Sequence, residues 1–319
     1  MKPPYSITKN ILSLIAQISE RIGEINAYYL NKPTTELRKK NRIKTIQASL
    51  EIEGNTLTEE QITALLDNKR VLAPQKDILE VQNAVKVYEL LRELNPHKLN
   101  DLCKAHKYLM NGLIDMAGEL RKKNVGIIKG SEVAHIAPGG NMVKSLMNDL
   151  FDYLKNENDL ILIKSCVFHY ELEFIHPFID GNGRMGRLWQ TLILMQQYPV
   201  FEYLPVETLI KNKQEEYYNV LTISDKLGNS TSFIEFMLAI ILEALEELLQ
   251  SQNKTVTKND RISIFKDKIV ESQFGRKEYL QNFKDISQAT ASRDLNWAVS
   301  EGILSKTGDK KNTKYHFIN

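Results

Sequence analysis

The residues best placed to do chemistry lie in one stretch, 174–187, which reads FIHPFIDGNGRMGR. A glycine turn that opens a helix exposes free backbone N–H groups, and such a turn binds anions. Arg184 and Arg187 fall at the start of the helix that follows, where each cation opposes the helix dipole by about 0.3–1 kcal/mol. We therefore expect a multiply charged anion, such as a triphosphate, to dock against this loop.

The two remaining polar side chains of the loop suit a transfer reaction on that anion. Asp180 is placed to hold Mg²⁺ between its carboxylate and phosphate oxygens, as magnesium usually binds. His176 is suited to take a proton from an incoming hydroxyl. Taken singly, Asp180 or Asn182 also fits a helix cap. A Walker A loop is disfavoured because Arg187 and Leu188 replace its Lys and Ser/Thr, and no strand precedes the loop.

The composition is that of an ordinary soluble protein. The 319 residues are 42% hydrophobic and 26% charged, with a net charge of +2, so no overall field favours nucleic acid or membrane. The start of the chain carries no apolar run of signal-peptide length, and the uncharged run 236–242 is far shorter than a membrane span. Cys103 and Cys166 lie in apolar helical patterns, which is typical of core thiols in a reducing compartment. We expect a cytoplasmic protein without membrane contact.

Helical periodicity dominates the chain, so the predicted fold class is mainly α. Helices are expected near 77–94, 98–113, 141–155, 159–174, 211–226 and 231–250. Residues 123–143 break the pattern and predict a small β-hairpin. Residues 254–319 hold 13 Lys and Arg against 8 Asp and Glu, a net +5, and their order of helices and short strands predicts a winged helix-turn-helix domain.

The segment from His176 to Arg187, HPFIDGNGRMGR, resembles the signature of the Fic family, and every defined position of that signature is present. The flanks are similar too: GELRKKNVGI (118–127) resembles the approach to the family's flap, and EEYYNVL (215–221) its Tyr-Tyr stretch. The resemblance implies a Fic helical domain with a β-hairpin flap. It suggests an N-terminal helical region 1–95, a catalytic core 96–250, a linker 251–259 and a winged-helix domain 260–319.

The resemblance also implies an activity, the transfer of AMP from ATP to a hydroxyl side chain (Tyr, Ser or Thr) of a protein, with ATP and Mg²⁺ required. His176 would be the general base, Phe178 would anchor the loop in the core, and Asp180 would bind Mg²⁺. Tyr217 and Tyr218 would line the nucleotide pocket, with core packing as the alternative. The residues implied to hold the phosphates are Gly181, Asn182, Gly183, Arg184 and Arg187.

A second motif lies upstream, in SLEIEG, where Ser49 and Glu53 are four residues apart and Gly54 follows. It resembles the inhibitory helix of Fic proteins, expected here over residues 42–54. By itself the motif also describes an ordinary helix end with a solvated glutamate. With the signature present, we expect Glu53 to pair with Arg187 and to occupy the position of the ATP γ-phosphate.

Partners and alternative functions remain open at this stage. The flap, about 125–137, would pair with a strand of the target protein. The target can also be another copy of this protein, which would be self-modification. The same site would also serve the removal of AMP or the transfer of another nucleotide. A regulator acting through DNA is the third alternative, with Arg293, Asn296 and Trp297 on the second helix of the winged helix, although this domain type also binds protein and Trp297 also fits a core. A homodimer is compatible with the sequence.

Overall fold

The computed structural model describes residues 2–27, 35–129, 132–253, 257–269, 273–283, 286–308 and 313–318. The chain divides into two compact units, the larger from residues 1–33 and 37–248 and the smaller from residues 34–36 and 249–319. The described helices of the larger unit are α1 (Lys9–Ala27), α2 (Thr35–Ile52), α3 (Glu59–Leu66), α4 (Gln75–Glu89), η1 (Leu91–Glu93), α5 (Leu99–Leu109), α6 (Val143–Asn156), α7 (Ile161–Ile175), α8 (Asn182–Met195), η2 (Pro199–Glu202), α9 (Val206–Asn212), α10 (Gln214–Leu227) and α11 (Thr231–Asn253). The mainly α fold class is confirmed. None of the described helices is both long and apolar enough to cross a membrane.

The centre of the larger unit is the pair α7 and α8, which pack against each other on either side of the signature loop. Both helices are buried along nearly their whole length, with Phe168 and Trp189 fully enclosed. A helix that is buried on all sides is enclosed by its neighbours, so its ends are held firmly. The loop between Ile175 and Asn182 therefore connects two helix ends that are held in place by their buried surroundings.

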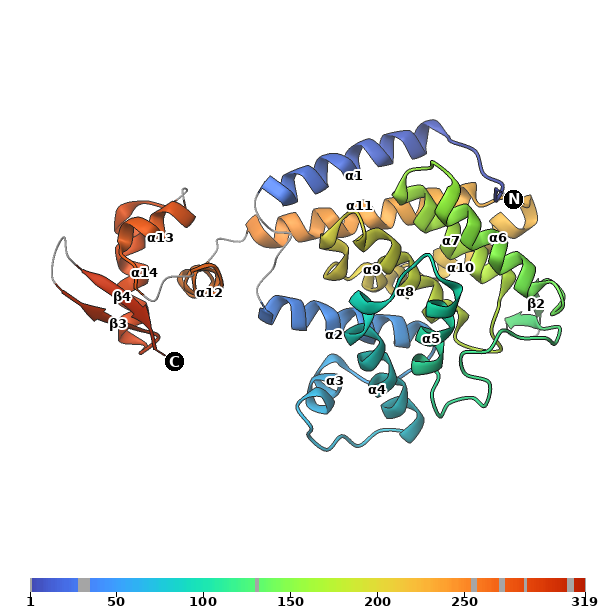
Figure 1. Ribbon diagram of the computed structural model, residues 1–319, viewed down its shortest axis with the longest axis horizontal. Helices are drawn as coiled ribbons and strands as arrows, with labels where there is room; N and C mark the ends of the chain where they lie inside the picture. Colours follow the sequence, from blue (N-terminus) through green and yellow to red (C-terminus); the bar gives the residue numbers. More distant parts are fainter. Residues whose placement is uncertain are drawn as a thin grey trace. The chain divides into compact units, whose positions relative to one another are not determined.

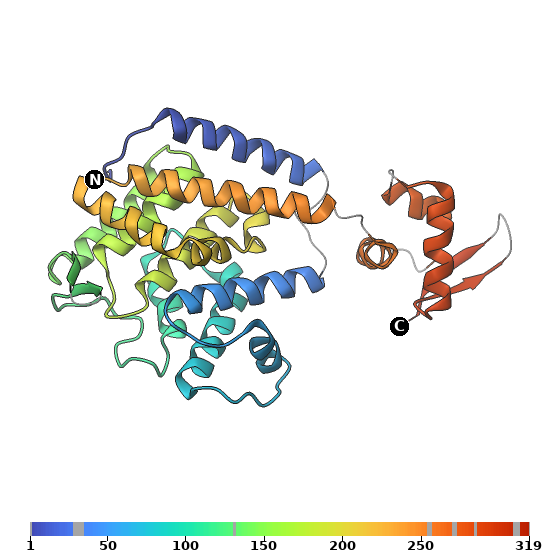
Figure 2. The same ribbon diagram turned by 180° about the vertical axis from the view of Figure 1, so that it is seen from behind.

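The long helices α1 and α11 lie alongside each other at the outside of the larger unit (Figure 1 and Figure 2). The apolar residues of α1 recur at three- or four-residue spacing and are buried: Ile11, Leu14, Ile18, Ile22 and Ile25. Hydrogen bonds join the two helices at one end, where Thr8 donates to Glu235, and Arg21 lies 3.8 Å from Glu246 farther along.

The predicted hairpin within 123–143 is present as β1 (Gly126–Lys129) and β2 (Glu132–Ile136), which pair antiparallel. The register shifts between Ile127 and Ile128, so the ladder contains an irregularity. The expected flap, about 125–137, covers this hairpin, and residues 130–131 of it lie outside the described residues.

Several predicted boundaries are wrong by a few residues. The helix expected over 42–54 ends at Ile52, and Glu53 and Gly54 form the turn that follows. The helix expected over 77–94 divides into α4 and η1, and the one expected over 211–226 divides at Lys213 between α9 and α10. The sequence at two of these breaks is polar, EGNT at 53–56 and KNKQEE at 211–216. Helix α11 also extends to Asn253, into the linker expected at 251–259.

The smaller unit contains α12 (Lys258–Lys268), α13 (Arg276–Asn282) and α14 (Gln288–Ser300), followed by β3 (Leu304–Thr307) and β4 (Lys314–Phe317), which pair antiparallel. Its core includes Phe265, Tyr279 and Leu295. Trp297 packs partly against this core and lies under the Lys258 ammonium at 4.7 Å, in accord with the core alternative. Arg293 and Asn296 are exposed. The winged-helix assignment of this element order stays a prediction.

Candidate active site

His176 ends α7 in the left-handed conformation, with φ 50° and ψ 60°. A non-glycine residue there is strained by about 1 kcal/mol or more, so surrounding contacts must hold it. Arg121 supplies them, because its side chain donates to the carbonyl oxygens of His176 (2.6 Å) and Ile175 (2.9 Å). The Nδ1 atom of His176 lies 3.4 Å from the Glu173 carbonyl oxygen. A carbonyl only accepts, which favours the tautomer that leaves Nε2 as proton acceptor.

Arg121 also ties the loop to the base of the hairpin. Its guanidinium donates to the carbonyl oxygens of Lys123 (2.8 Å) and Pro138 (2.7 Å), and its backbone N–H donates to Pro177 (2.9 Å). The residue is 1% exposed, and burial lowers its pKa. One side chain thus holds the general-base candidate and the predicted flap in a fixed relation. The stretch 118–127, which contains Arg121, stood out in the sequence, but these carbonyl acceptors could not be predicted from it.

A buried histidine, His106 of α5, holds the other side of the loop. Its Nδ1 accepts the N–H of Gly118 at 2.8 Å, so its Nε2 carries the proton and donates to the Asp180 carbonyl oxygen at 2.9 Å. The ring stacks on Phe178, with centroids 3.7 Å apart and planes at 5°. Burial lowers the pKa of His106 to about 4, so it is neutral at pH 7. Phe178 is fully buried, as expected for a loop anchor.

Asn182 closes the loop with its side chain. Its Oδ1 accepts the N–H of Phe178 at 2.9 Å and its Nδ2 donates to the Phe178 carbonyl at 3.0 Å. Gly181 has φ 84°, and a Cβ there would lie 2.8 Å from the sulfur of Met110. The first intrahelical bond of α8 runs from Met185 to Gly181, so the N–H groups of residues 182–184 come before the helical ladder. Those N–H groups are the donors that the expected anion site would use.

Arg184 lies in the first turn of α8 and is only 4% exposed. It donates from Nη1 to Glu80 at 3.2 Å and from Nη2 to Asp180 Oδ1 at 3.1 Å. Glu80 belongs to α4, and its side chain is 7% exposed. The sequence did not predict this buried acid, because a glutamate in a helix that also carries exposed residues usually points to solvent.

Arg187 lies in the second turn of α8, one turn later than the sequence predicted for it. Its Nη2 contacts Glu53 Oε1 at 2.7 Å and donates to the Ser49 carbonyl at 3.0 Å, while its Nε donates to Ser49 Oγ at 3.1 Å. Burial alone would lower the pKa of Arg187, but the charge and hydrogen bond of Glu53 raise it overall. The pairing expected of Glu53 and Arg187 is present as a contact.

The carboxylate of Glu53 lies against the start of α8. A Cβ built on Gly183 would be 2.6 Å from Glu53 Oε1. The Glu53 side chain is 27% exposed, whereas that of Arg187 is 1% exposed. A negatively charged oxygen therefore already sits at the position where the glycine turn and the helix dipole favour an anion.

The residues at Asp180 fit a magnesium ion that is shared with phosphate. Its side chain is 51% exposed, and Oδ1 accepts from Arg184 and from the N–H of Gly181. Within the described ranges Oδ2 accepts no hydrogen bond, so it can take a cation. The same ranges contain no group of three or more His, Cys, Asp or Glu placed to hold a metal. One carboxylate plus phosphate oxygens is the arrangement that magnesium commonly adopts.

The two tyrosines differ. Tyr217 is 1% exposed and lies in the core beside Phe233, with its hydroxyl 3.0 Å from His169 Nε2 and 3.4 Å from Glu173 Oε1. Burial raises the pKa of Tyr217 and, to a smaller extent, that of the half-buried Tyr218. Core packing, the alternative to a place in the nucleotide pocket, is what Tyr217 shows. A pocket-lining role for either tyrosine stays a prediction.

Comparisons with known proteins agree with this arrangement. Residues 96–194 match the model of the Fic/DOC family. Over 199 residues the chain is 30% identical to the protein adenylyltransferase fic-1 of Caenorhabditis elegans, covering 58% of this chain and 37% of that protein. It is 27% identical to the protein adenylyltransferase Fic of Drosophila willistoni, covering 70% and 45%. The chain thus spans less than half the length of these curated relatives.

Solved structures extend the likeness to the whole chain. A Fic family protein from Desulfovibrio desulfuricans G20 superposes with a TM-score of 0.78 and 42% identity, over all of this chain and 99% of that one. Residues 134–508 of C. elegans Fic-1 share the fold, with a TM-score of 0.64 at 19% identity, over 77% of this chain and 73% of that one. With the complete signature loop folded between α7 and α8, these matches show that the chain belongs to the Fic family.

Proposed function

We propose that this protein transfers AMP from ATP to a hydroxyl side chain of a protein, and that Glu53 restrains the transfer. One observation carries the proposal: Glu53 places a carboxylate on Arg187, at the N-terminal turn of α8, where a phosphate would bind. The names of the curated relatives support the same reaction type.

The chain's own residues account for the steps. The hydroxyl oxygen of the target attacks the α-phosphorus while His176 Nε2 takes its proton, and the bond to the β-phosphate breaks so that pyrophosphate leaves. The N–H groups at residues 182–184, with Arg184 and Arg187, would neutralise the phosphate oxygens. Asp180 would hold Mg²⁺, which when bound neutralises further phosphate charge. Arg121 and His106 keep the loop in place throughout.

Glu53 and the γ-phosphate would compete for the same guanidinium. With Glu53 in place, ATP would bind without its γ-phosphate on Arg187, and the α-phosphorus would not face the incoming hydroxyl. Because catalysis of this kind depends on positioning, a displaced phosphate lowers the rate strongly. The partly exposed setting of Glu53 supports an exchange, since water can solvate the carboxylate when it leaves.

The target would approach along the hairpin β1–β2. A two-stranded sheet presents unpaired edge groups, and an extended peptide can add a strand there. This proposal concerns the backbone of residues 126–129 and 132–136. It leaves the identity of the target to experiment.

The test uses ATP labelled at the α-phosphate, with the γ-labelled nucleotide in parallel. We expect the Glu53→Gly variant to attach the α-label, and not the γ-label, to itself or to proteins of a cell lysate. His176→Ala in the Glu53→Gly background should lose this labelling and still bind ATP. Labelling by the γ-phosphate would indicate a kinase instead, and unchanged labelling without His176 would refute its role as base.

The same experiment addresses the reverse reaction. Pre-labelled protein is incubated with wild-type chain and with Glu53→Gly. Faster loss of AMP with wild-type protein would mean that Glu53 aligns a water and that removal of AMP is the main activity.

A further inference from the structure

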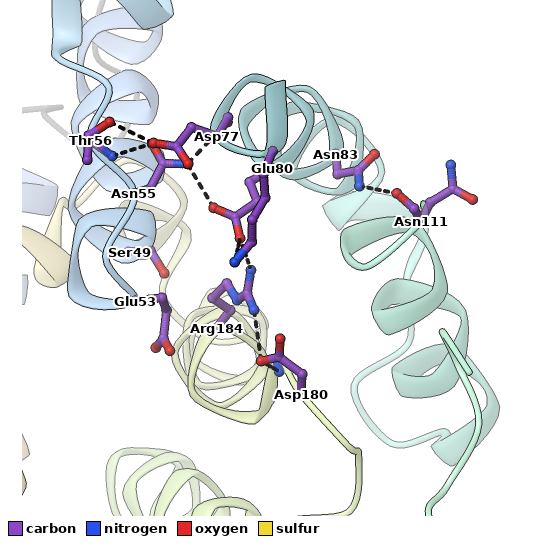
Figure 3. A network of polar contacts seen from close by, with 12 residues as sticks. Ser49, Glu53, Asn55, Thr56, Asp77, Glu80, Asn83, Asn111, Asp180 and Arg184 are labelled. Atoms are coloured by element: carbon purple, nitrogen blue, oxygen red, sulfur yellow. Dashed lines mark hydrogen bonds and ion pairs between the residues drawn. The ribbon is translucent and has the colours of Figure 1, made fainter. Parts of the chain in front are cut away.

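A buried network of polar contacts that the sequence did not predict runs from Arg184 through Glu80 to Asn55 (Figure 3). Glu80 of α4 accepts from Arg184 through Oε1 at 3.2 Å and from Asn55 Nδ2 through Oε2 at 2.8 Å. Asn55 is two residues beyond Glu53 and is 5% exposed. A single buried carboxylate therefore touches the anion site on one side and, on the other, the segment that carries the inhibitory glutamate.

Several further hydrogen bonds hold the segment 53–57, most of them made by the backbone or at the exposed surface. Its turn depends on backbone bonds from Glu53 and Asn55 to the Leu50 carbonyl. Asn55 adds a bond to the Asp77 carbonyl at 3.1 Å and accepts the N–H of Leu57 at 3.1 Å. The remaining side-chain bonds join Thr56 to the exposed end of α4 through Asp77. The bond to Glu80 is the buried, charge-assisted one, and such bonds are roughly twice as strong as neutral ones.

We propose that Asn55 and Glu80 form a latch, the Asn55 Nδ2 to Glu80 Oε2 hydrogen bond, that keeps Glu53 on Arg187. The inference deepens the proposed function and depends on it for its effect on catalysis. Glu80 acts as a positioning residue, because it touches neither hydroxyl nor phosphate and acts through Asn55 and Arg184. Opening the latch frees the segment after α2, so Glu53 leaves Arg187 more often and the γ-phosphate can take its place.

The first test observes the latch without any nucleotide. Hydrogen exchange is followed in peptides that cover residues 50–57, in wild-type protein and in Asn55→Ala. The matched control is Asn83→Ala. Asn83 is also a buried asparagine and lies on α4, the helix that carries Glu80, but its amide donates to the Asn111 carbonyl at 2.8 Å and not to the segment 53–57. We expect about tenfold faster exchange in Asn55→Ala and none of this change in Asn83→Ala. Equal exchange in all three proteins would overturn the latch.

The second test measures AMP transfer in two backgrounds. In the wild-type background, Asn55→Ala should raise transfer about tenfold, while Asn83→Ala leaves it unchanged. In the Glu53→Gly background, Asn55→Ala should change transfer by less than about twofold, since no inhibitory carboxylate remains to release. A similar rise in both backgrounds, or no rise in either, would overturn the coupling.

The two tests separate the two proposals. If Glu53→Gly itself transfers no AMP, the proposed function fails, and the exchange data still decide whether the latch holds the segment. If Glu53→Gly is active but Asn55→Ala behaves like Asn83→Ala in both tests, the latch fails and the proposed function stands. Thermal unfolding of each variant shows whether it is folded when it is compared.

Discussion

Arg184 and Arg187 are three residues apart on one helix, both buried, and each is paired with a carboxylate, yet the two pairs differ in kind. The partner of Arg184 is Glu80, in the middle of α4 with a side chain only 7% exposed. The partner of Arg187 is Glu53, in a turn after the end of α2 with a side chain 27% exposed. We therefore interpret the Arg184–Glu80 pair as a fixed support of the loop and the Arg187–Glu53 pair as a contact that an anion can replace.

The difference follows from where each acid is attached. Glu80 is held on both oxygens, and leaving would strand a charge in the interior, which costs several kcal/mol. Glu53 precedes Gly54, whose φ of 91° places a turn immediately behind it. A small change in that turn moves the carboxylate into water. Under the proposed function, position in the chain, more than the chemistry of the pair, would decide which arginine can exchange its carboxylate for an anion.

The largest difference should appear in stability. Glu80→Ala leaves Arg184 without its buried partner and should lower the free energy of unfolding by about 3–5 kcal/mol. Glu53→Gly should cost only about 1–3 kcal/mol, because Arg187 keeps both bonds to Ser49. Urea unfolding of the two variants and of wild-type protein measures both values.

Nucleotide sharpens this contrast. ATP with Mg²⁺ should stabilise Glu53→Gly more than it stabilises wild-type protein, since the γ-phosphate replaces the lost carboxylate. It should leave the gap between Glu80→Ala and wild-type protein in place, because no phosphate reaches the buried side of Arg184. Equal recovery of both variants would show that the two pairs are equivalent.

A smaller effect is expected from pH. The pKa of His106 is lowered to about 4 by burial, below its unfolded value near 6.5, so the unfolded chain binds a proton first as the pH falls. The stabilisation is present above pH 6.5 and is lost between pH 6.5 and 4. In urea unfolding, the loss from pH 7 to pH 5 should be about 2 kcal/mol smaller in His106→Gln than in wild-type protein. An identical loss in both proteins would mean that His106 is not held neutral.

The smallest contrast concerns two glycines of α8. A Cβ on Gly186 would lie 2.6 Å from the ring of His169, which is held by Gln190 and Tyr217, so Gly186→Ala should cost about 1–3 kcal/mol. A Cβ on Gly183 would lie 2.6 Å from Glu53 Oε1, the end of a partly exposed side chain that can shift into water, and 3.2 Å from Arg187 Nη1. Gly183→Ala should therefore cost less, about 1 kcal/mol for the displaced Glu53 contact. The thermal unfolding midpoints of the two variants measure this difference. Equal decreases in the midpoint would show that the Glu53 side chain is held as firmly as the ring of His169 in the core.

The sequence was sufficient to predict the loop because its functional residues are contiguous. His176, Asp180 and Arg184 fall within one short motif whose glycines already indicated an anion site. Glu53 could be predicted because it has a motif of its own. The helices followed from periodicity and the hairpin from the break in it at 123–143. The end of the helix over 42–54 was expected close to where α2 ends, whereas the division at Lys213 was missed.

The supports of the loop could not be predicted because each is a single polar residue that is distant in sequence from what it holds. Arg121, His106 and Glu80 lie in stretches that read as ordinary helix or loop, and their partners become evident only in three dimensions. Long-range pairing leaves little local trace in a sequence.

The central claim is that Glu53 occupies Arg187 in place of a phosphate, and AMP transfer by Glu53→Gly tests it most directly. Wild-type protein, Glu53→Gly and Glu53→Gly with Arg187→Ala are incubated with α-labelled ATP and Mg²⁺, and the attached label is counted. The account predicts at least about tenfold more label with Glu53→Gly than with wild-type protein, and loss of that gain when Arg187 is also removed. Equal labelling by wild-type protein and Glu53→Gly, with both proteins folded, would contradict it.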